Sequence, residues 1–157
     1  MTPMQGWSTT GTYMPTGGSE MRRRIFADTS ALYELVDENT LHHREVAEFL
    51  RENARSIRLV ITDYIFDEVL TLVMTKLGKH HAIVLGEKLR SSEFCSMVKV
   101  ESEDVEAAWE VFRRYKDKEW SFTDCTSYVV MKRLDIREAL ATDDHFRQMG
   151  LSVLPGL

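Results

Sequence analysis

Short apolar segments alternate along this chain with longer segments of helical periodicity, and this alternation constrains the possible folds more than any other feature. The strand-like segments are rich in aliphatic and β-branched residues, and they lie at 25–27, 57–61, 94–100, 138–141 and 152–154. Between them, apolar residues recur every three or four positions, which is typical of amphipathic helices. The alternation predicts an α/β fold with a mainly parallel sheet, whose right-handed connections place helices on both faces.

Capping residues mark where several of the helices should begin and end. Thr62 or Asp63 is placed to cap a strongly apolar helix, which Gly78 would end. Ser102 precedes an acidic first turn, which suits the positive end of a helix dipole. Further helices are expected at 40–54, at 81–89, at 122–133 and, as a single turn, at 144–149.

Residues 1–20 differ in composition from the rest of the chain. They contain one charged residue, two of the three prolines and four of the eight glycines, whereas no proline occurs from Met21 to Leu154. Such a segment cannot bury enough apolar surface to offset the entropy of ordering it. We therefore expect a flexible segment over 1–20, left by a tag or a misassigned start, and one folded domain over 21–157. The alternative is a recognition arm that carries Trp7 and Tyr13.

The overall composition is that of a globular protein with an acidic surplus. Hydrophobic residues make up 43%, and 20 Lys and Arg stand against 25 Asp and Glu, which gives a formal charge of −5. This balance argues against a polybasic protein and leaves room for a site that binds metal cations. Cys95 and Cys125 lack the paired spacing of a zinc cluster or a disulfide framework, and no apolar run reaches the length of a membrane span. We expect a cytoplasmic protein without a membrane partner.

Four carboxylates stand out by their positions, and two of them lie where strands of such a sheet should end. Asp28 directly follows the first strand and Asp143 the fourth, while Glu68 and Asp124 lie in the first turns of two helices. The carboxyl ends of parallel strands meet at one edge, where open α/β sheets bind their ligands. Taken singly, each carboxylate also fits a structural role as a turn residue, a helix cap or a solvated side chain.

Four segments carry these acids together with characteristic neighbours. They are IFADTSAL at 25–32, DYIFDEVL at 63–70, WSFTDCTSYVVM at 120–131 and ALATDDHF at 139–146. In this order and spacing, across 22–155, the chain resembles the PIN-domain ribonucleases and, within them, the VapC-type toxins of toxin–antitoxin pairs. The resemblance implies a three-layer α/β/α sandwich, four acids around Mg²⁺ or Mn²⁺, and cleavage of single-stranded or loop RNA. It also implies a homodimer that a small antitoxin protein inhibits.

The resemblance assigns roles to individual residues. The catalytic acids would be Asp28, Glu68, Asp124 and Asp143. Of these, the three aspartates would ligate the metal, while Glu68 would either ligate it or orient the attacking water. Asp144 adjoins Asp143 and could replace it, although the register of the ALATDDHF segment favours Asp143. The neighbours that could hydrogen-bond ligands or phosphate are Thr29, Ser30 and Thr123.

Carboxylates suit this chemistry for a simple electrostatic reason. Hydrolysis of an RNA phosphodiester needs an activated water and neutralisation of charge on the phosphate, and a hard divalent cation with oxygen ligands supplies both. Two carboxylates about 4 Å apart repel each other by roughly 4 kcal/mol at an effective dielectric constant near 20. Four acids in one place would therefore take up protons or bind a cation.

Other functions remain open at this point. The chain could be a PIN nuclease of RNA maturation or decay that has no antitoxin, or an inactive PIN fold used for binding. An aspartate-based phosphatase of the haloacid-dehalogenase type fits poorly, because its DxD motif needs a second aspartate where Ser30 stands. Nucleotide-binding folds are disfavoured because neither GxGxxG nor GxxxxGK[ST] occurs.

Basic and imidazole side chains have both structural and functional interpretations. The pairs His42–His43 and His80–His81 are predicted to be surface residues, since neighbours on a helix point apart, and His145 is predicted to pack or cap locally. A set of basic residues could be solvated or could bind RNA phosphates around the site. The set is Arg22, Arg23, Arg24, Arg113, Arg114, Lys116, Lys118, Lys132 and Arg133.

Overall fold

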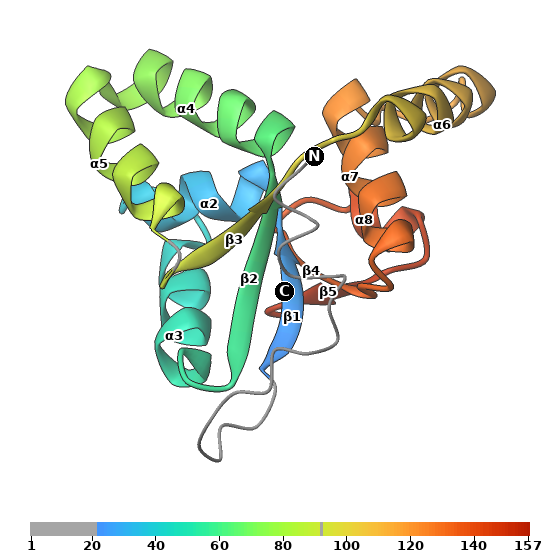
Figure 1. Ribbon diagram of the computed structural model, residues 1–157. Coiled ribbons are helices and arrows are strands. Elements are labelled where there is room, and N and C mark those ends of the chain that lie inside the picture. The colour runs from blue at the N-terminus through green and yellow to red at the C-terminus, as the bar shows by residue number, and fades with distance from the viewer. Residues whose placement is uncertain (1–21, 92) are drawn as a thin grey trace.

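The computed structural model describes residues 22–91 and 93–157, so the expectation for the segment 1–20 lies outside the described residues. A five-stranded sheet in the order β3-β2-β1-β4-β5 forms the centre, and each neighbouring pair of strands is parallel (Figure 1). The strands are β1 (Arg23–Ala27), β2 (Ile57–Thr62), β3 (Cys95–Val98), β4 (Glu138–Leu140) and β5 (Ser152–Leu154). The prediction of a parallel α/β sheet is confirmed, with β3 shorter than expected at both ends.

Helices cover both faces of the sheet, which confirms the three-layer sandwich. Figure 1 shows α2 (Thr29–Val36), α3 (His43–Asn53), α4 (Asp63–Leu77) and α5 (Lys79–Arg90) on one side. On the other side lie α6 (Ser102–Arg114), α7 (Phe122–Arg133) and the short α8 (His145–Gln148). Helix α2 was not among the expected helices. No helix of the described residues is both long and apolar enough to span a membrane.

The strand order explains why the helices divide in this way. From β1 the chain moves outward to β2 and then to β3. It then returns across the sheet and adds β4 beside β1 and β5 beside β4. Because parallel connections are right-handed, reversing the direction of progress moves the connecting helices to the opposite face. The order therefore reverses between β1 and β4, and the carboxyl ends of these two strands flank the position where open α/β sheets bind ligands.

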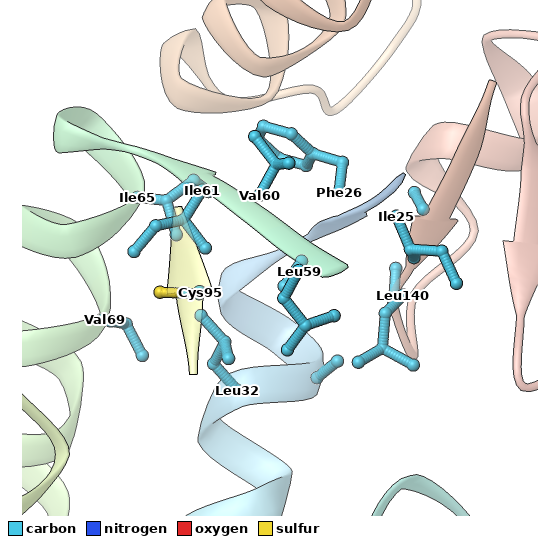
Figure 2. Packing of buried hydrophobic residues seen from close by; sticks show 14 of the residues in the cluster. Ile25, Phe26, Leu32, Leu59, Val60, Ile61, Ile65, Val69, Cys95 and Leu140 are labelled. Atoms are coloured by element: carbon cyan, nitrogen blue, oxygen red, sulfur yellow. The ribbon is translucent and has the colours of Figure 1, made fainter. Parts of the chain in front are cut away.

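The strands pack against both helical layers. Ile25, Phe26 and Ala27 are fully buried. In Figure 2, Phe26 and its register partner Val60 lie on the opposite side of the strands from Leu59 and Leu32. The Phe26 ring also contacts the Phe146 ring of α8, with 6.4 Å between the centroids. This contact fixes α8, and the loop before it, beside the end of β1.

The ends of α4 follow the predicted caps. Thr62 precedes the helix and its Oγ1 accepts a hydrogen bond from the Ile65 N–H at 3.1 Å. Gly78 follows it with φ +97°, a conformation that side chains with a Cβ rarely adopt. The prediction that Gly78 ends this helix is confirmed, and the same residue precedes α5.

Candidate active site

Asp28 lies at the junction of β1 and α2, where the strand order reverses. Its backbone N–H donates to the Leu140 carbonyl of β4 at 2.9 Å, and its Oδ2 caps α2 by accepting from the Ser30 N–H at 3.2 Å. The Ser30 hydroxyl also donates to Oδ2, at 2.7 Å, and accepts from the Thr142 N–H at 3.0 Å. Ser30 thus ties the end of β1 to the loop after β4 and fixes the orientation of the Asp28 carboxylate.

Asp124 reaches the same region from the first turn of α7. Its Oδ2 accepts from the Ser121 N–H at 2.9 Å, while the Ser121 hydroxyl accepts from the Asp124 N–H at 3.0 Å. These reciprocal bonds form a capping box, which holds the carboxylate at the helix start. The residue is only 5% exposed. A second interaction joins the same Oδ2 to Nδ1 of His145 at 2.7 Å.

Asp143 follows β4 and brings the third carboxylate to this edge. Its Oδ1 accepts from the His145 N–H at 3.1 Å, and its Oδ2 lies 3.9 Å from His145 Nδ1. The side chain of the neighbouring Asp144 is 72% exposed and forms an ion pair with Arg147. The structure thus favours Asp143 over Asp144 as the acid that faces the other two.

Electrostatic coupling shows that the three aspartates converge. Burial, followed by the charges of Asp124 and Asp143, raises the pKa of Asp28 from its ordinary value of 3.8 to about 7, against the opposing effect of the hydrogen bonds from Ser30. Burial also raises the pKa of Asp143; the backbone N–H and the charge of His145 oppose this shift, and the charges of Asp124 and Asp144 add to it. Side chains almost a hundred residues apart in sequence therefore share one negatively charged site.

Buried polar atoms near these carboxylates lack partners within the described part of the chain. They are Oδ1 of Asp28 and the hydroxyls of Thr29 and Ser127. Thr29 adjoins Asp28, and Ser127 lies one turn after Asp124 on the same helix. A buried oxygen without a hydrogen bond is costly, and such atoms often mark a place where a ligand binds. The Asp28 oxygen is therefore available to a cation.

Glu68 and Thr123 are less closely tied to this group. Glu68 lies in the second turn of α4, half-buried, and it is not among the charges that shift the pKa of Asp28 or Asp143. Thr123 adjoins Asp124 and is half-buried. Among residues 22–91 and 93–157, no three His, Cys, Asp or Glu side chains are close enough together to form a ready-made set of metal ligands. The aspartates interact electrostatically but are not closed into a coordination shell.

His145 is the residue of this site that the sequence pattern did not identify, since it predicted only local packing or capping. Its ring bonds to Asp124 and its backbone to Asp143, so it joins two of the three carboxylates. Burial lowers the pKa of His145, but the bond with Asp124 and the charges of Asp124, Asp143 and Asp28 outweigh it, and the net pKa is raised. The one available signal was its position two residues after Asp143.

Of the three aspartates, Asp143 lines a hollow of about 510 Å³ that is open to solvent. Asp144 and His145 line it as well, together with the loop residues 117–119. A polar ligand can therefore approach the carboxylates from the α7–α8 side of the sheet.

Known proteins resemble this chain in both sequence and structure. The chain is 29% identical, over 126 residues, to the 23S rRNA-specific endonuclease VapC20 of Mycobacterium tuberculosis, which covers 80% of this chain and 94% of that protein. The crystal structure of VapC20, described as a sarcin–ricin loop cleaving toxin, superposes with a TM-score of 0.74 at 27% identity, covering 81% of this chain and 95% of that one.

A more distant structure shares the fold alone. The crystal structure of VapBC2 from Rickettsia felis, bound to a DNA fragment from its promoter, matches with a TM-score of 0.64 at 10% identity over 83% of this chain and 96% of that one. The PIN domain family model matches residues 25–151, which include all the acids described above. This protein therefore belongs to the PIN domain family.

Proposed function

We propose that this protein is a metal-dependent endoribonuclease that acts as the toxin of a VapBC-type toxin–antitoxin pair. One observation carries the proposal: Asp28, Asp124 and Asp143 converge at the switch point of the sheet, where burial and the other two charges raise the pKa of Asp28 to about 7. A structural carboxylate is normally neutralised by a cation or left in solvent. Strongly perturbed acids in a solvent-accessible hollow are instead typical of catalytic sites.

The donor atoms suit Mg²⁺ or Mn²⁺. All three side chains offer carboxylate oxygens, which hard divalent cations prefer, and Asp28 contributes a buried Oδ1 without another partner. Asp124 would bind through Oδ1, because its Oδ2 already accepts from Ser121 and interacts with His145. When bound, such an ion supplies Lewis-acid stabilisation of the phosphate and lowers the pKa of a coordinated water.

The remaining residues hold this arrangement and receive the substrate. Ser30 orients the Asp28 carboxylate, and the backbone of His145 orients Asp143. Glu68, from the α4 side, would orient the attacking water, and Thr29 and Thr123 would donate hydrogen bonds to phosphate oxygens. Lys118, which lines the hollow beside Asp143 and whose Nζ lies 3.6 Å from Asp117 Oδ2, would balance charge on an RNA phosphate.

The similarity to VapC20 suggests which RNA to test first. That protein is named for 23S rRNA, and its structure is described as that of a sarcin–ricin loop cleaving toxin. We propose a structured loop of 23S rRNA as the substrate of this chain as well. A small antitoxin and a second copy of the chain are the proposed partners, and the cytoplasm the proposed location. A short reading frame just upstream that encodes a DNA-binding protein would support the antitoxin.

The proposal is tested by incubating the purified protein with a sarcin–ricin stem–loop and with transfer RNA, in Mg²⁺, in Mn²⁺ or in EDTA. We expect cleavage of the stem–loop with either ion, none in EDTA, and none by Asp28→Asn. Equal cleavage by wild type and Asp28→Asn would indicate a contaminating nuclease. No cleavage of any RNA by the wild type would contradict the proposed function.

A further inference from the structure

A second hollow, of about 720 Å³, lies between the end of α6 and the middle of α7. We refer to it as the α6–α7 hollow. Its cationic and aromatic lining is Arg113, Arg114, Tyr115, Lys116, Tyr128 and Lys132. None of these residues is among the acids of the candidate active site, and the hollow has no role in the mechanism above.

The cations of the α6–α7 hollow are largely uncompensated. Arg113 pairs with Glu110 at 2.7 Å, and Glu110 is the single carboxylate in the lining. Arg114, Lys116 and Lys132 form no salt bridge with any residue that the structure describes. Four cations therefore face one carboxylate, on a chain whose formal charge is −5. A concentrated positive charge on an acidic protein favours a polyanionic ligand.

Aromatic rings accompany these cations. Tyr115 is 41% exposed and its ring packs against Trp120, with 5.0 Å between the centroids. Lys132 Nζ lies 5.4 Å from the centroid of the Tyr128 ring. Cations that follow a backbone, beside ring faces on which bases stack, are the combination by which proteins hold single-stranded nucleic acid. An acidic protein segment would use the cations but has no such use for the rings.

The linings of the α6–α7 hollow and of the hollow beside Asp143 adjoin each other along the chain. Tyr115 and Lys116 line the α6–α7 hollow, and the next three residues along the chain, 117–119, line the hollow beside Asp143 and His145. On α7, Lys132 lies eight residues after Asp124, a rise of roughly 12 Å along the helix axis. A strand of a few nucleotides can span that interval.

Other basic residues of the chain are engaged or distant. Arg133, next to Lys132, forms an ion pair with Asp104 at 2.7 Å. Arg23 pairs with Glu138 and Arg24 donates to the Leu134 carbonyl, both at the start of β1 and thus at the strand end opposite Asp28. Of the basic residues that the sequence suggested for binding RNA phosphates, the structure favours those of the α6–α7 hollow and the neighbouring Lys118.

We propose that the α6–α7 hollow binds the phosphate backbone of the RNA substrate to one side of the cleaved bond. This inference rests on the proposed function, because it assigns a binding subsite to the same RNA. Arg114 and Lys132 contact phosphates, and Tyr115 and Tyr128 stack on or flank the bases.

The test compares two double variants with the same loss of charge. Arg114→Gln/Lys132→Gln removes two cations of the hollow. Arg55→Gln/Lys76→Gln removes two exposed cations elsewhere. A fluorescent sarcin–ricin stem–loop serves as the probe, with Kd measured in EDTA and kcat and KM measured in Mg²⁺. We expect the hollow variant to raise Kd and KM at least tenfold, to leave kcat within about twofold, and to reduce the slope of log Kd against log salt by about 1.4. The control variant should match wild type.

Other results would overturn the inference or assign the α6–α7 hollow to another ligand. Equal Kd and KM for both variants would overturn the inference. Competition by poly-glutamate as effective as that by RNA, or a change of oligomeric state in the hollow variant alone, would reassign the hollow to a protein partner or to a second copy. A wild type that binds the stem–loop through the hollow but cleaves nothing would contradict only the proposed function.

Discussion

Two aspartates of this protein have the same local role and different surroundings. Asp104 and Asp124 each lie in the first turn of a helix, and each accepts a hydrogen bond from the backbone N–H three residues earlier, at 2.8 and 2.9 Å. Both are buried, at 3% and 5% exposure. Nε and Nη2 of the Arg133 guanidinium both donate to the Asp104 carboxylate, at 2.9 and 2.7 Å. Asp124 instead has the His145 ring on one side and the charges of two other aspartates nearby.

The difference shows how one capping pattern serves either stability or chemistry. A buried carboxylate that is paired bidentately with arginine has its charge neutralised and its oxygens occupied. A buried carboxylate beside like charges carries an electrostatic cost that folding alone does not relieve, and a cation would relieve it. We therefore assign Asp104 to the packing of α6 on α7, and Asp124 to the candidate active site.

The largest expected effect is a loss of RNA cleavage when Asp124 is replaced, but not when Asp104 is replaced. Asp124→Asn should reduce RNA cleavage by ~1,000-fold, because several kcal/mol of transition-state charge stabilisation depend on the bound cation. Asp104→Asn should retain cleavage within about threefold per folded molecule. The measurement is kcat/KM on the stem–loop at a temperature where circular dichroism shows both variants folded. Equal losses of kcat/KM in both variants would show that Asp104 and Asp124 do not differ in their role in cleavage.

The second prediction concerns the contribution of the Asp104–Arg133 pair to the stability of the fold. Arg133→Met leaves the buried Asp104 carboxylate without its partner, which should lower the free energy of unfolding by roughly 3 kcal/mol. This lies at the low end for a buried pair, because the Arg133 side chain is 30% exposed. Urea denaturation measures the change, with Arg44→Met, at an exposed pair with Glu48, as the control. A change below about 1 kcal/mol would contradict a structural role for the Asp104–Arg133 pair.

The third prediction uses the pKa of Asp28. Folding raises this pKa from 3.8 to about 7, so between these values the folded state holds a proton that the unfolded state has released. The contribution of Asp28 to stability is therefore complete below about pH 4 and is lost as the pH rises towards 7. In EDTA, Asp28→Asn should be more stable than wild type at pH 8, by roughly 4 kcal/mol because each pKa unit corresponds to about 1.4 kcal/mol, with little difference at pH 4. Denaturation at both pH values tests this, and a stability difference independent of pH would contradict the assigned environment.

The smallest expected effect concerns His145. Its ring holds one oxygen of Asp124, so His145→Gln should weaken metal binding and cleavage by ~10-fold, as expected for a group that orients a ligand. His80→Gln, at an exposed position of α5, provides the control. Metal affinity by calorimetry, together with kcat and KM, distinguishes the two. Unchanged metal affinity in His145→Gln would show that the ring does not position Asp124.

Short aliphatic runs in the sequence predicted the strands of the sheet. The caps Thr62 and Gly78 predicted where α4 begins and ends. Neither signal predicted α2, whose eight residues follow Asp28 without a long amphipathic pattern. Strand ends predicted that Asp28 and Asp143 would lie at one edge, whereas Asp124 was identified through the family resemblance. The register of the ALATDDHF segment already favoured Asp143, and the structure adds that Asp144 pairs with Arg147. The roles of His145 and Arg133 depend on tertiary contacts between α6, α7 and α8, which no local pattern encodes.

The central claim is that three aspartates, brought together only by the fold, form one divalent-cation site. Calorimetric titration of Mn²⁺ into the EDTA-treated and dialysed wild type, Asp104→Asn and Asp124→Asn tests it most directly. We predict the same saturable binding in wild type and Asp104→Asn, and affinity at least tenfold weaker in Asp124→Asn. Identical titrations for all three proteins, or no binding by the wild type, would contradict the claim.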